Sequence, residues 1–262
     1  MAMALVGGCA ACRPEPTGAA PLPPCLGVVF VADGAGDFRA CSAHLRQAVE
    51  EAGCPLEVRT FVWSHGHRHN LSDQIDRRHA QDRGCCLAGA VAAELTEHPS
   101  RPVYLVGHSA GCAVVLAAAA QLPPGSVERM VLLAPSVRAD GDLGPAARTS
   151  RSGIDVFCSR KDWVCRAVVP ILEALLHLEW PAVSGCEGFP ACDGVRHHWW
   201  HPGLKPFGHD GSHCGAYQPA HLRAFVLPLL TAPAGPASLP WNRRPHRRDQ
   251  PGGSPCLCER RG

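Results

Sequence analysis

A serine lies at the centre of a Gly-His-Ser-Ala-Gly motif at residues 107–111. A short apolar run at 103–106 precedes the motif, and an alanine-rich run that favours a helix follows it. In this context G-x-S-x-G predicts a nucleophile elbow, a sharp turn that lifts a serine hydroxyl clear of a sheet. Glycines at both ends leave room for the strand and helix backbones to pass close together. Ser109 is therefore the predicted nucleophile. The alternative is a structural serine in a buried turn.

A serine nucleophile needs a base to take its proton and an acid that orients the base. Asp162 comes shortly after an apolar run at 154–158 and begins a helical pattern, so it can also cap that helix. Asp155 lies inside the same run, and Asp140 and Asp142 lie in a loop after a different strand. Asp162 is therefore the preferred acid.

The sequence contains fifteen histidines, so the base has several candidates. The chain order Ser, Asp, His leaves those that follow Asp162, namely His177, His197, His198, His201, His209, His213 and His221. A glycine-rich loop at 208–217 lies just before the last predicted helix and can reach over a sheet edge. We favour His213 over His209 because His213 is nearer that helix and small residues flank it. The alternative for each histidine is a surface or hydrogen-bonded structural role.

Hydrolysis by a serine also needs two backbone N–H groups that bind the developing oxyanion. The N–H of Ala110 opens the predicted helix and supplies the first. The second is expected from the Asp-Gly-Ala-Gly turn after the first strand, from the backbone of Gly34 or Ala35. Asp33 and Asp37 can be turn formers only.

The elements that position these groups alternate along the chain. Apolar runs predict strands at 26–32, 56–63, 103–106, 130–134 and 154–158. Helical patterns occur at about 40–52, 85–97, after the elbow, 163–178 and 220–230, whereas 180–216 has no clear period. This order predicts an α/β fold, a three-layer α/β/α sandwich with a mostly parallel sheet.

Composition predicts one such domain at residues 26–231 of the 262. The Pro-rich residues 1–25 and the Pro- and Arg-rich residues 232–262 are expected to be disordered tails. A net charge of +2 gives no field suited to nucleic acid. No apolar run is long enough for stable membrane insertion. We expect a cytoplasmic protein, although Val6-Gly7-Gly8-Cys9 faintly resembles a lipoprotein cleavage box and a secretory start stays open.

Three other features invite alternatives. One feature is a set of alternating histidines, His65, His67 and His69, which could hold a transition metal. We prefer the interpretation that this segment is a rim loop beside the active site. The fifteen cysteines contain no paired C-x-x-C motifs, so their spacing does not predict a zinc ribbon. Neither a metal nor another cofactor is expected. Cys186 and Cys192 could pair in an oxidising compartment. The adjacent tryptophans Trp199 and Trp200 could line an apolar pocket, but we prefer the interpretation that they cover an edge of the sheet.

The motifs together resemble small serine hydrolases of the α/β-hydrolase superfamily, near cutinase-like and small lipase-like bacterial members. The resemblance covers about residues 27–230. It rests on D-G-A-G at 33–36, W-S-H-G at 63–66, G-H-S-A-G at 107–111, S-R-K-D at 159–162 and G-S-H-C-G-A-Y at 211–217. It supports His213 rather than His209. Ser212 and Cys214 depart from the usual neighbours, which bears on the pocket lining and not on the three reactive side chains.

The resemblance implies hydrolysis of an ester or related acyl bond in a small-molecule substrate, through an acyl-enzyme on Ser109, His213 and Asp162. Two alternatives stay open. An acyltransferase would use the same three residues with an alcohol in place of water, and a non-catalytic binding protein would keep only the fold. The sequence does not indicate the acyl group, the alcohol or the oligomeric state.

Overall fold

The computed structural model describes residues 26–176 and 182–232. Six parallel strands form one sheet in the order β2-β1-β3-β4-β5-β6. Their bounds are Gly27–Ala32 for β1, Leu56–Thr60 for β2, Val103–His108 for β3, Arg129–Leu133 for β4, Ile154–Cys158 for β5 and Val195–Trp199 for β6. β1, β3, β4 and β5 are buried along their whole length, which explains their continuous apolar runs. The predicted α/β class is confirmed.

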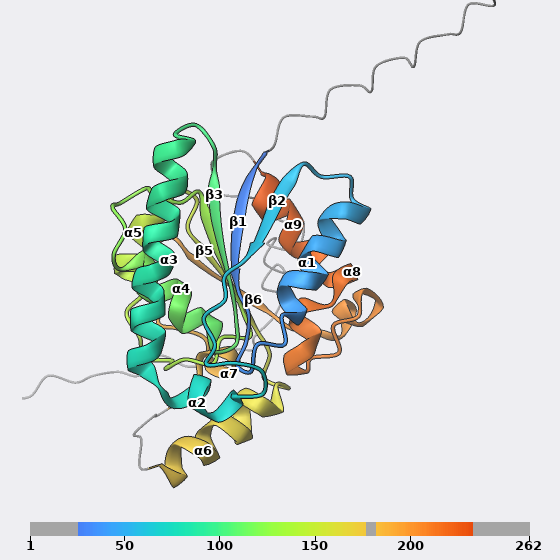
Figure 1. Cartoon of the computed structure of the whole chain (residues 1–262). Helices are drawn as coiled ribbons and strands as arrows, with labels where there is room; N and C mark the ends of the chain where they lie inside the picture. Colours follow the sequence, from blue (N-terminus) through green and yellow to red (C-terminus); the bar gives the residue numbers. More distant parts are fainter. Residues whose placement is uncertain (1–25, 177–181, 233–262) are drawn as a thin grey trace, which may run out of the picture.

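Helices cover both faces of the sheet (Figure 1). On one face lie α3 (Arg77–Glu97), α4 (Gly111–Ala119) and α5 (Gly144–Thr149). On the other lie α1 (Ala40–Glu51) and the C-terminal run of α8 (Pro219–His221), η4 (Leu222–Val226) and α9 (Leu227–Thr231). Each face has its own buried apolar cluster, so the sheet separates two cores.

The remaining helical segments are short. Near the end of the sheet where the strands terminate lie α2 (Asn70–Ile75), the π-helix η1 (Val164–Val168) with α6 (Val169–Leu175), and α7 (Ser184–Glu187). Two 3₁₀ segments follow β6, η2 (Pro202–Phe207) and η3 (His213–Tyr217). No helix of the described ranges combines the length and apolarity needed to cross a bilayer.

The sequence prediction missed β6 and placed the start of α3 eight residues too late. β6 has the sequence VRHHW and is an edge strand, with only one neighbour, β5. Its polar residues hid it because an edge strand needs no continuous apolar run. α3 begins at Arg77, where the Asp76 side chain accepts a hydrogen bond from the His79 N–H. The predictions for residues 1–25 and for most of 232–262 lie outside the described residues.

Asp155, the carboxylate inside β5, has a structural environment. Its side chain is fully buried and accepts hydrogen bonds from Arg129 at 2.8 Å, from Arg196 at 2.8 and 2.9 Å, and from His198 at 2.7 Å. Burial raises the pKa of Asp155, but the hydrogen bonds and charges of His198 and Arg196 outweigh it, so that the net pKa lies well below the ordinary value. This cluster joins β4, β5 and β6.

Asp155→Ala is expected to lower the free energy of unfolding by about 3–5 kcal/mol, because it leaves buried cations without their counter-charge. Asp155→Asn provides a milder variant should Asp155→Ala fail to accumulate. The matched control is Glu51→Ala, which removes an exposed pair with Arg223 and should cost about 0–1 kcal/mol. Urea unfolding measures both, and equal losses in the two variants would contradict the structural role.

The same cluster predicts a pH dependence. The folded-state pKa of Asp155 is depressed, so its contribution is complete above the unfolded-state pKa of about 3.9 and is lost as the pH falls below it. Unfolding free energies measured from about pH 6 to 3 should therefore fall more steeply for the parent chain than for Asp155→Asn. Parallel curves would contradict this prediction.

Candidate active site

Ser109 lies on a strained turn between β3 and α4. Its backbone φ is +53°, in the left-handed region that non-glycine residues rarely adopt. The strain is held by close packing: a Cβ on Gly111 would lie 2.2 Å from the carbonyl oxygen of Ala32 and 2.3 Å from that of Asp33. A Cβ on Gly107 would likewise lie 2.8 Å from the Cα of Cys112. This geometry agrees with the predicted elbow and brings α4 directly onto the loop after β1.

A continuous chain of hydrogen bonds joins three side chains from distant parts of the sequence. The Ser109 Oγ lies 2.8 Å from His213 Nε2, and His213 Nδ1 lies 2.6 Å from Asp162 Oδ2. The carboxylate can only accept, so Nδ1 carries the proton and Nε2 is left to accept from the serine hydroxyl. All three side chains are buried, with Asp162 fully so. The arrangement can therefore pass a proton from Ser109 to an imidazole that a carboxylate orients.

Asp162 also caps the helix that follows it. Its second oxygen, Oδ1, accepts from the N–H groups of Val164 at 3.0 Å and Cys165 at 3.2 Å. One carboxylate thus binds the helix N–H groups with one oxygen and His213 with the other. These backbone bonds fix the carboxylate in the orientation that His213 requires.

The loops that carry Asp162 and His213 are tied to each other. The Ser159 hydroxyl donates to the carbonyl of Gly211 at 2.7 Å. Trp200 donates from its indole N–H to the carbonyl of His209 at 2.9 Å, and the Lys161 ammonium lies 4.8 Å from the centre of its ring. Trp200 thus contacts both the loop of Asp162 and the loop of His213. The sequence prediction missed this role.

His108 packs against the His213 ring, with the ring centres 5.0 Å apart. Its other neighbour is Tyr217, whose ring meets it edge to face. Burial, and secondarily the charge of His213, lower the pKa of His108 well below the ordinary value. The His108 ring that packs against His213 is therefore uncharged near neutral pH. The motif itself contains this residue, but its type alone does not indicate packing against His213.

The backbone N–H groups predicted to bind an oxyanion surround Ser109. A Cβ on Gly34 would lie 3.2 Å from the Ser109 Cβ and 2.9 Å from His108 Nδ1, which places the Gly34 backbone beside the nucleophile. Ala110 is the N-cap of α4. No oxygen of the described residues accepts a hydrogen bond from the N–H of Gly34, Ala35 or Ala110. Such unpaired donors next to a serine hydroxyl can stabilise an oxyanion.

Asp73 holds the loop that carries Gly34. Its buried carboxylate accepts from the Gly36 N–H at 2.7 Å, the Ser64 hydroxyl at 2.5 Å and the His65 N–H at 2.8 Å, and it pairs with His65 Nδ1 at 2.9 Å. Burial raises the pKa of Asp73, but these hydrogen bonds outweigh it and lower the net value. The sequence prediction noted Asp73 only as a residue following the alternating histidines.

The three alternating histidines do not share a site. His65 pairs with Asp73 and stacks on His79, while the His67 ring meets Phe38 edge to face. Within the described ranges, the only cluster of three metal-binding side chains is Asp162, Cys165 and His213. The segment lies beside the loop after β1, where the Arg68 N–H donates to the Gly36 carbonyl at 2.9 Å.

The other histidine and cysteine candidates lie elsewhere. His209 is buried against His221, and burial lowers its pKa to about 4; His213, not His209, contacts Ser109. His177 lies outside the described residues. Cys186 and Cys192 are both free, and the Cys186 thiol donates to the Asp162 carbonyl at 3.2 Å. The two thiols are therefore unpaired in this structure, and their pairing in an oxidising compartment stays a prediction.

A cavity of about 370 Å³ opens beside the elbow. It extends from Ala110 along one face of α4 toward α3 and α5. Ser136, on its wall, donates from its N–H to the Ser109 carbonyl at 3.1 Å. The apolar lining includes Ala110, Ala113, Leu116, Ala117, Ala120, Leu143, Ala146 and Phe189, and polar residues including Arg77, Arg138 and Asp142 also contribute. Such a lining suits an apolar group.

Comparisons with known proteins found one family match, which covers part of the chain. Residues 79–163 match the family described as serine aminopeptidase, S33, a segment that contains Ser109 and Asp162. No curated protein sequence matches the chain. A CIB-like hydrolase from Thermoplasma acidophilum is similar in structure, with a TM-score of 0.47 and 16% identity over 79% of this chain and 87% of that one.

Two further solved structures are similar at low identity. A Trichoderma reesei cutinase gives a TM-score of 0.38 and 16% identity over 80% of each chain. A type II thioesterase of the yersiniabactin pathway gives a TM-score of 0.45 and 15% sequence identity over 79% of this chain and 92% of that one. The strand order is that of a parallel α/β sheet, and over residues 79–163 the chain is similar to the serine aminopeptidase family.

Gly34→Ala is expected to slow the reaction of Ser109 with a fluorophosphonate by roughly tenfold or more, because its Cβ would press on His108 and Ser109 and displace the loop. The labelling rate, followed by mass spectrometry, measures this effect. Gly89→Ala on α3 is the matched control, since its Cβ would meet nothing within 4 Å. Equal labelling rates for the two variants would contradict the prediction, because they would show that the reaction of Ser109 does not depend on the position of the Gly34 backbone.

Proposed function

We propose that this chain is a serine hydrolase that cleaves an ester with an apolar acyl group through an acyl-enzyme intermediate. The observation that carries the proposal is the hydrogen-bonded chain from Ser109 through His213 to Asp162. A serine hydroxyl aligned on an imidazole that a buried carboxylate orients is the arrangement needed for nucleophilic attack on a carbonyl carbon.

The first half of the reaction forms the acyl-enzyme. His213 Nε2 takes the proton of Ser109 as Oγ attacks the ester carbonyl, and Asp162 stabilises the imidazolium that results. The N–H of Ala110 and that of Gly34 or Ala35 donate to the oxyanion of the tetrahedral intermediate. Collapse of the intermediate expels the alcohol, which takes the proton from His213.

The second half returns the enzyme to its starting state. His213 takes a proton from water, the hydroxide attacks the acyl carbon, and Ser109 leaves with the proton that His213 returns. The carboxylic acid is the second product. If an alcohol occupied the place of water, the same steps would transfer the acyl group, so the acceptor decides between hydrolysis and acyl transfer.

The cavity beside Ala110 supports an apolar acyl group. It starts at the residue whose N–H is proposed to bind the oxyanion, and Ala113, Ala117 and Ala120 line it along one face of α4. These residues span about 10 Å of helix, since each residue rises about 1.5 Å. An acyl chain entering there is expected to gain about 0.8 kcal/mol for each buried CH₂.

The first test compares the parent chain with Ser109→Ala. The parent is expected to hydrolyse p-nitrophenyl esters and to take up one fluorophosphonate at Ser109, while Ser109→Ala loses labelling and at least about a thousandfold in kcat. An aminoacyl anilide tests peptidase activity in parallel, and an added alcohol tests acyl transfer by product analysis. A parent chain that neither labels nor hydrolyses would indicate a binding protein on this fold.

A second prediction concerns the cavity. Ala113→Leu is expected to lower kcat/KM for the octanoate ester about tenfold relative to the acetate ester, because its side chain fills space that two CH₂ groups would occupy. Ala93→Leu, an exposed position on α3, adds the same groups away from the cavity and should leave the ratio unchanged. An unchanged ratio in Ala113→Leu would place the acyl group elsewhere.

A further inference from the structure

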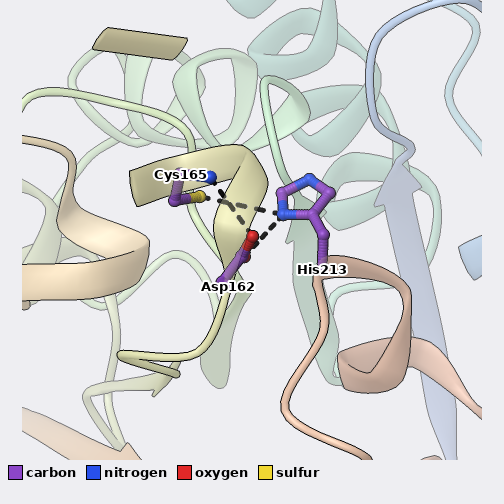
Figure 2. A group of neighbouring side chains, drawn as sticks. All are labelled: Asp162, Cys165 and His213. Atoms are coloured by element: carbon purple, nitrogen blue, oxygen red, sulfur yellow. Dashed lines mark hydrogen bonds and ion pairs between the residues drawn. The ribbon is translucent and has the colours of Figure 1, made fainter. Parts of the chain in front are cut away.

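A cysteine lies against the two residues that are proposed to activate Ser109. The Cys165 Sγ is 3.7 Å from His213 Nδ1, the nitrogen that also contacts Asp162 (Figure 2). Ligand atoms of Asp162, Cys165 and His213 all lie within 4.8 Å of one another, and all three residues are buried. Neither the orientation of a base nor the capping of a helix requires a thiol here.

The distance between the Cys165 sulfur and the His213 nitrogen matches the dimensions of a tetrahedral zinc site. Zn–S bonds of about 2.3 Å and Zn–N bonds of about 2.0–2.1 Å place sulfur and nitrogen about 3.6 Å apart at the tetrahedral angle. The observed sulfur–nitrogen distance is 3.7 Å. The Asp162–His213 contact of 2.6 Å is too short for two ligands of one ion and must open to about 3.3 Å, as happens when a metal replaces the shared proton.

The surroundings allow this small change. Asp162 would bind through Oδ2 and keep the hydrogen bonds that its Oδ1 accepts from Val164 and Cys165. A second thiol, that of Cys186, donates to the Asp162 carbonyl at 3.2 Å and leaves the Asp162 carboxylate free to move. The His213 side chain keeps 11% exposure, so the cluster is not fully enclosed.

We propose that Asp162, Cys165 and His213 form an inhibitory site for a borderline-soft divalent cation such as Zn²⁺. Thiolate, imidazole and carboxylate together favour Zn²⁺ over the oxygen-seeking Mg²⁺ and Ca²⁺. Binding releases the thiol proton of Cys165 to solvent. The bound group is then neutral overall, since two negative ligands balance the ion, which suits a buried position.

The same binding disables the base. The proton of His213 moves from Nδ1, which the metal takes, to Nε2. An Nε2–H can only donate to the Ser109 Oγ and cannot accept its proton, so acylation stops while the fold and the substrate cavity remain intact. This consequence rests on the proposed serine-hydrolase function, whereas the metal binding itself does not.

Cobalt tests the binding independently of any activity. Co²⁺ added to the full chain is expected to produce a thiolate-to-cobalt charge-transfer band in the parent and in Ser109→Ala, but not in Cys165→Ala. Cys41→Ala, which removes another buried thiol away from the cluster, should keep the band. Absence of the band in the parent, or its persistence in Cys165→Ala, would overturn the proposal.

Ester hydrolysis tests the inhibition. Zn²⁺ is expected to inhibit the parent and Cys41→Ala, a chelator to restore both, and Mg²⁺ to have no effect. Cys165→Ala should keep its hydrolysis and need at least tenfold more Zn²⁺ for half inhibition, with Cys165→Ser as a second variant if the first is unstable. Equal Zn²⁺ sensitivity in all variants would contradict the site, and a cobalt band without any hydrolysis would contradict the proposed function alone.

Discussion

The close approach of α4 to the end of β1 is the constraint on which the rest of the site depends. Gly111 lies so near the carbonyls of Ala32 and Asp33 that a single methyl group would not fit. This contact forces the chain at Ser109 into a left-handed conformation, which costs on the order of 1–2 kcal/mol for a residue with a side chain. The packing of α4 against the sheet compensates for that cost. The result is a serine hydroxyl that stands clear of the sheet beside the Gly34 backbone.

The other parts of the site are held by buried polar contacts rather than by the sheet itself. Asp73 fixes the loop that carries Gly34 through hydrogen bonds from three separate backbone or side-chain groups, and Trp200 braces the loop that precedes His213. Hydrogen bonds to a buried carboxylate are strong, and losing one leaves an unpaired charge. The loops are therefore positioned by interactions whose loss is costly, which suits groups that must keep their distances within a fraction of an ångström.

Two buried carboxylates that follow one another in the chain have different environments. Asp155 has cations as partners and is thereby fixed as a charged link between strands. Asp162 has no arginine or lysine among its hydrogen-bond partners in the described structure; its partners are backbone N–H groups and His213. An acid that orients a histidine must leave the imidazole as its main counter-charge, because a neighbouring arginine would compete for the carboxylate. The adjacent thiols of Cys165 and Cys186 are the soft donors of this environment within the described residues.

The sequence by itself determined the architecture and the identity of the main chemical groups. The apolar runs of β1, β3, β4 and β5 are strong signals because both faces of those strands are buried, and the elbow motif is local, so its turn follows from adjacent residues. Chain order and loop composition led to Asp162 and His213, and the structure places His213 between Asp162 and Ser109. Only the tertiary structure could decide the rest. β6 is stabilised at the edge by Asp155 of a neighbouring strand, and Asp73, His108, Trp200 and Cys165 acquire their positions from segments far away in the chain. Such contacts leave no periodic trace, since a polar side chain finds its partner only when folding brings distant loops to the same edge of the sheet.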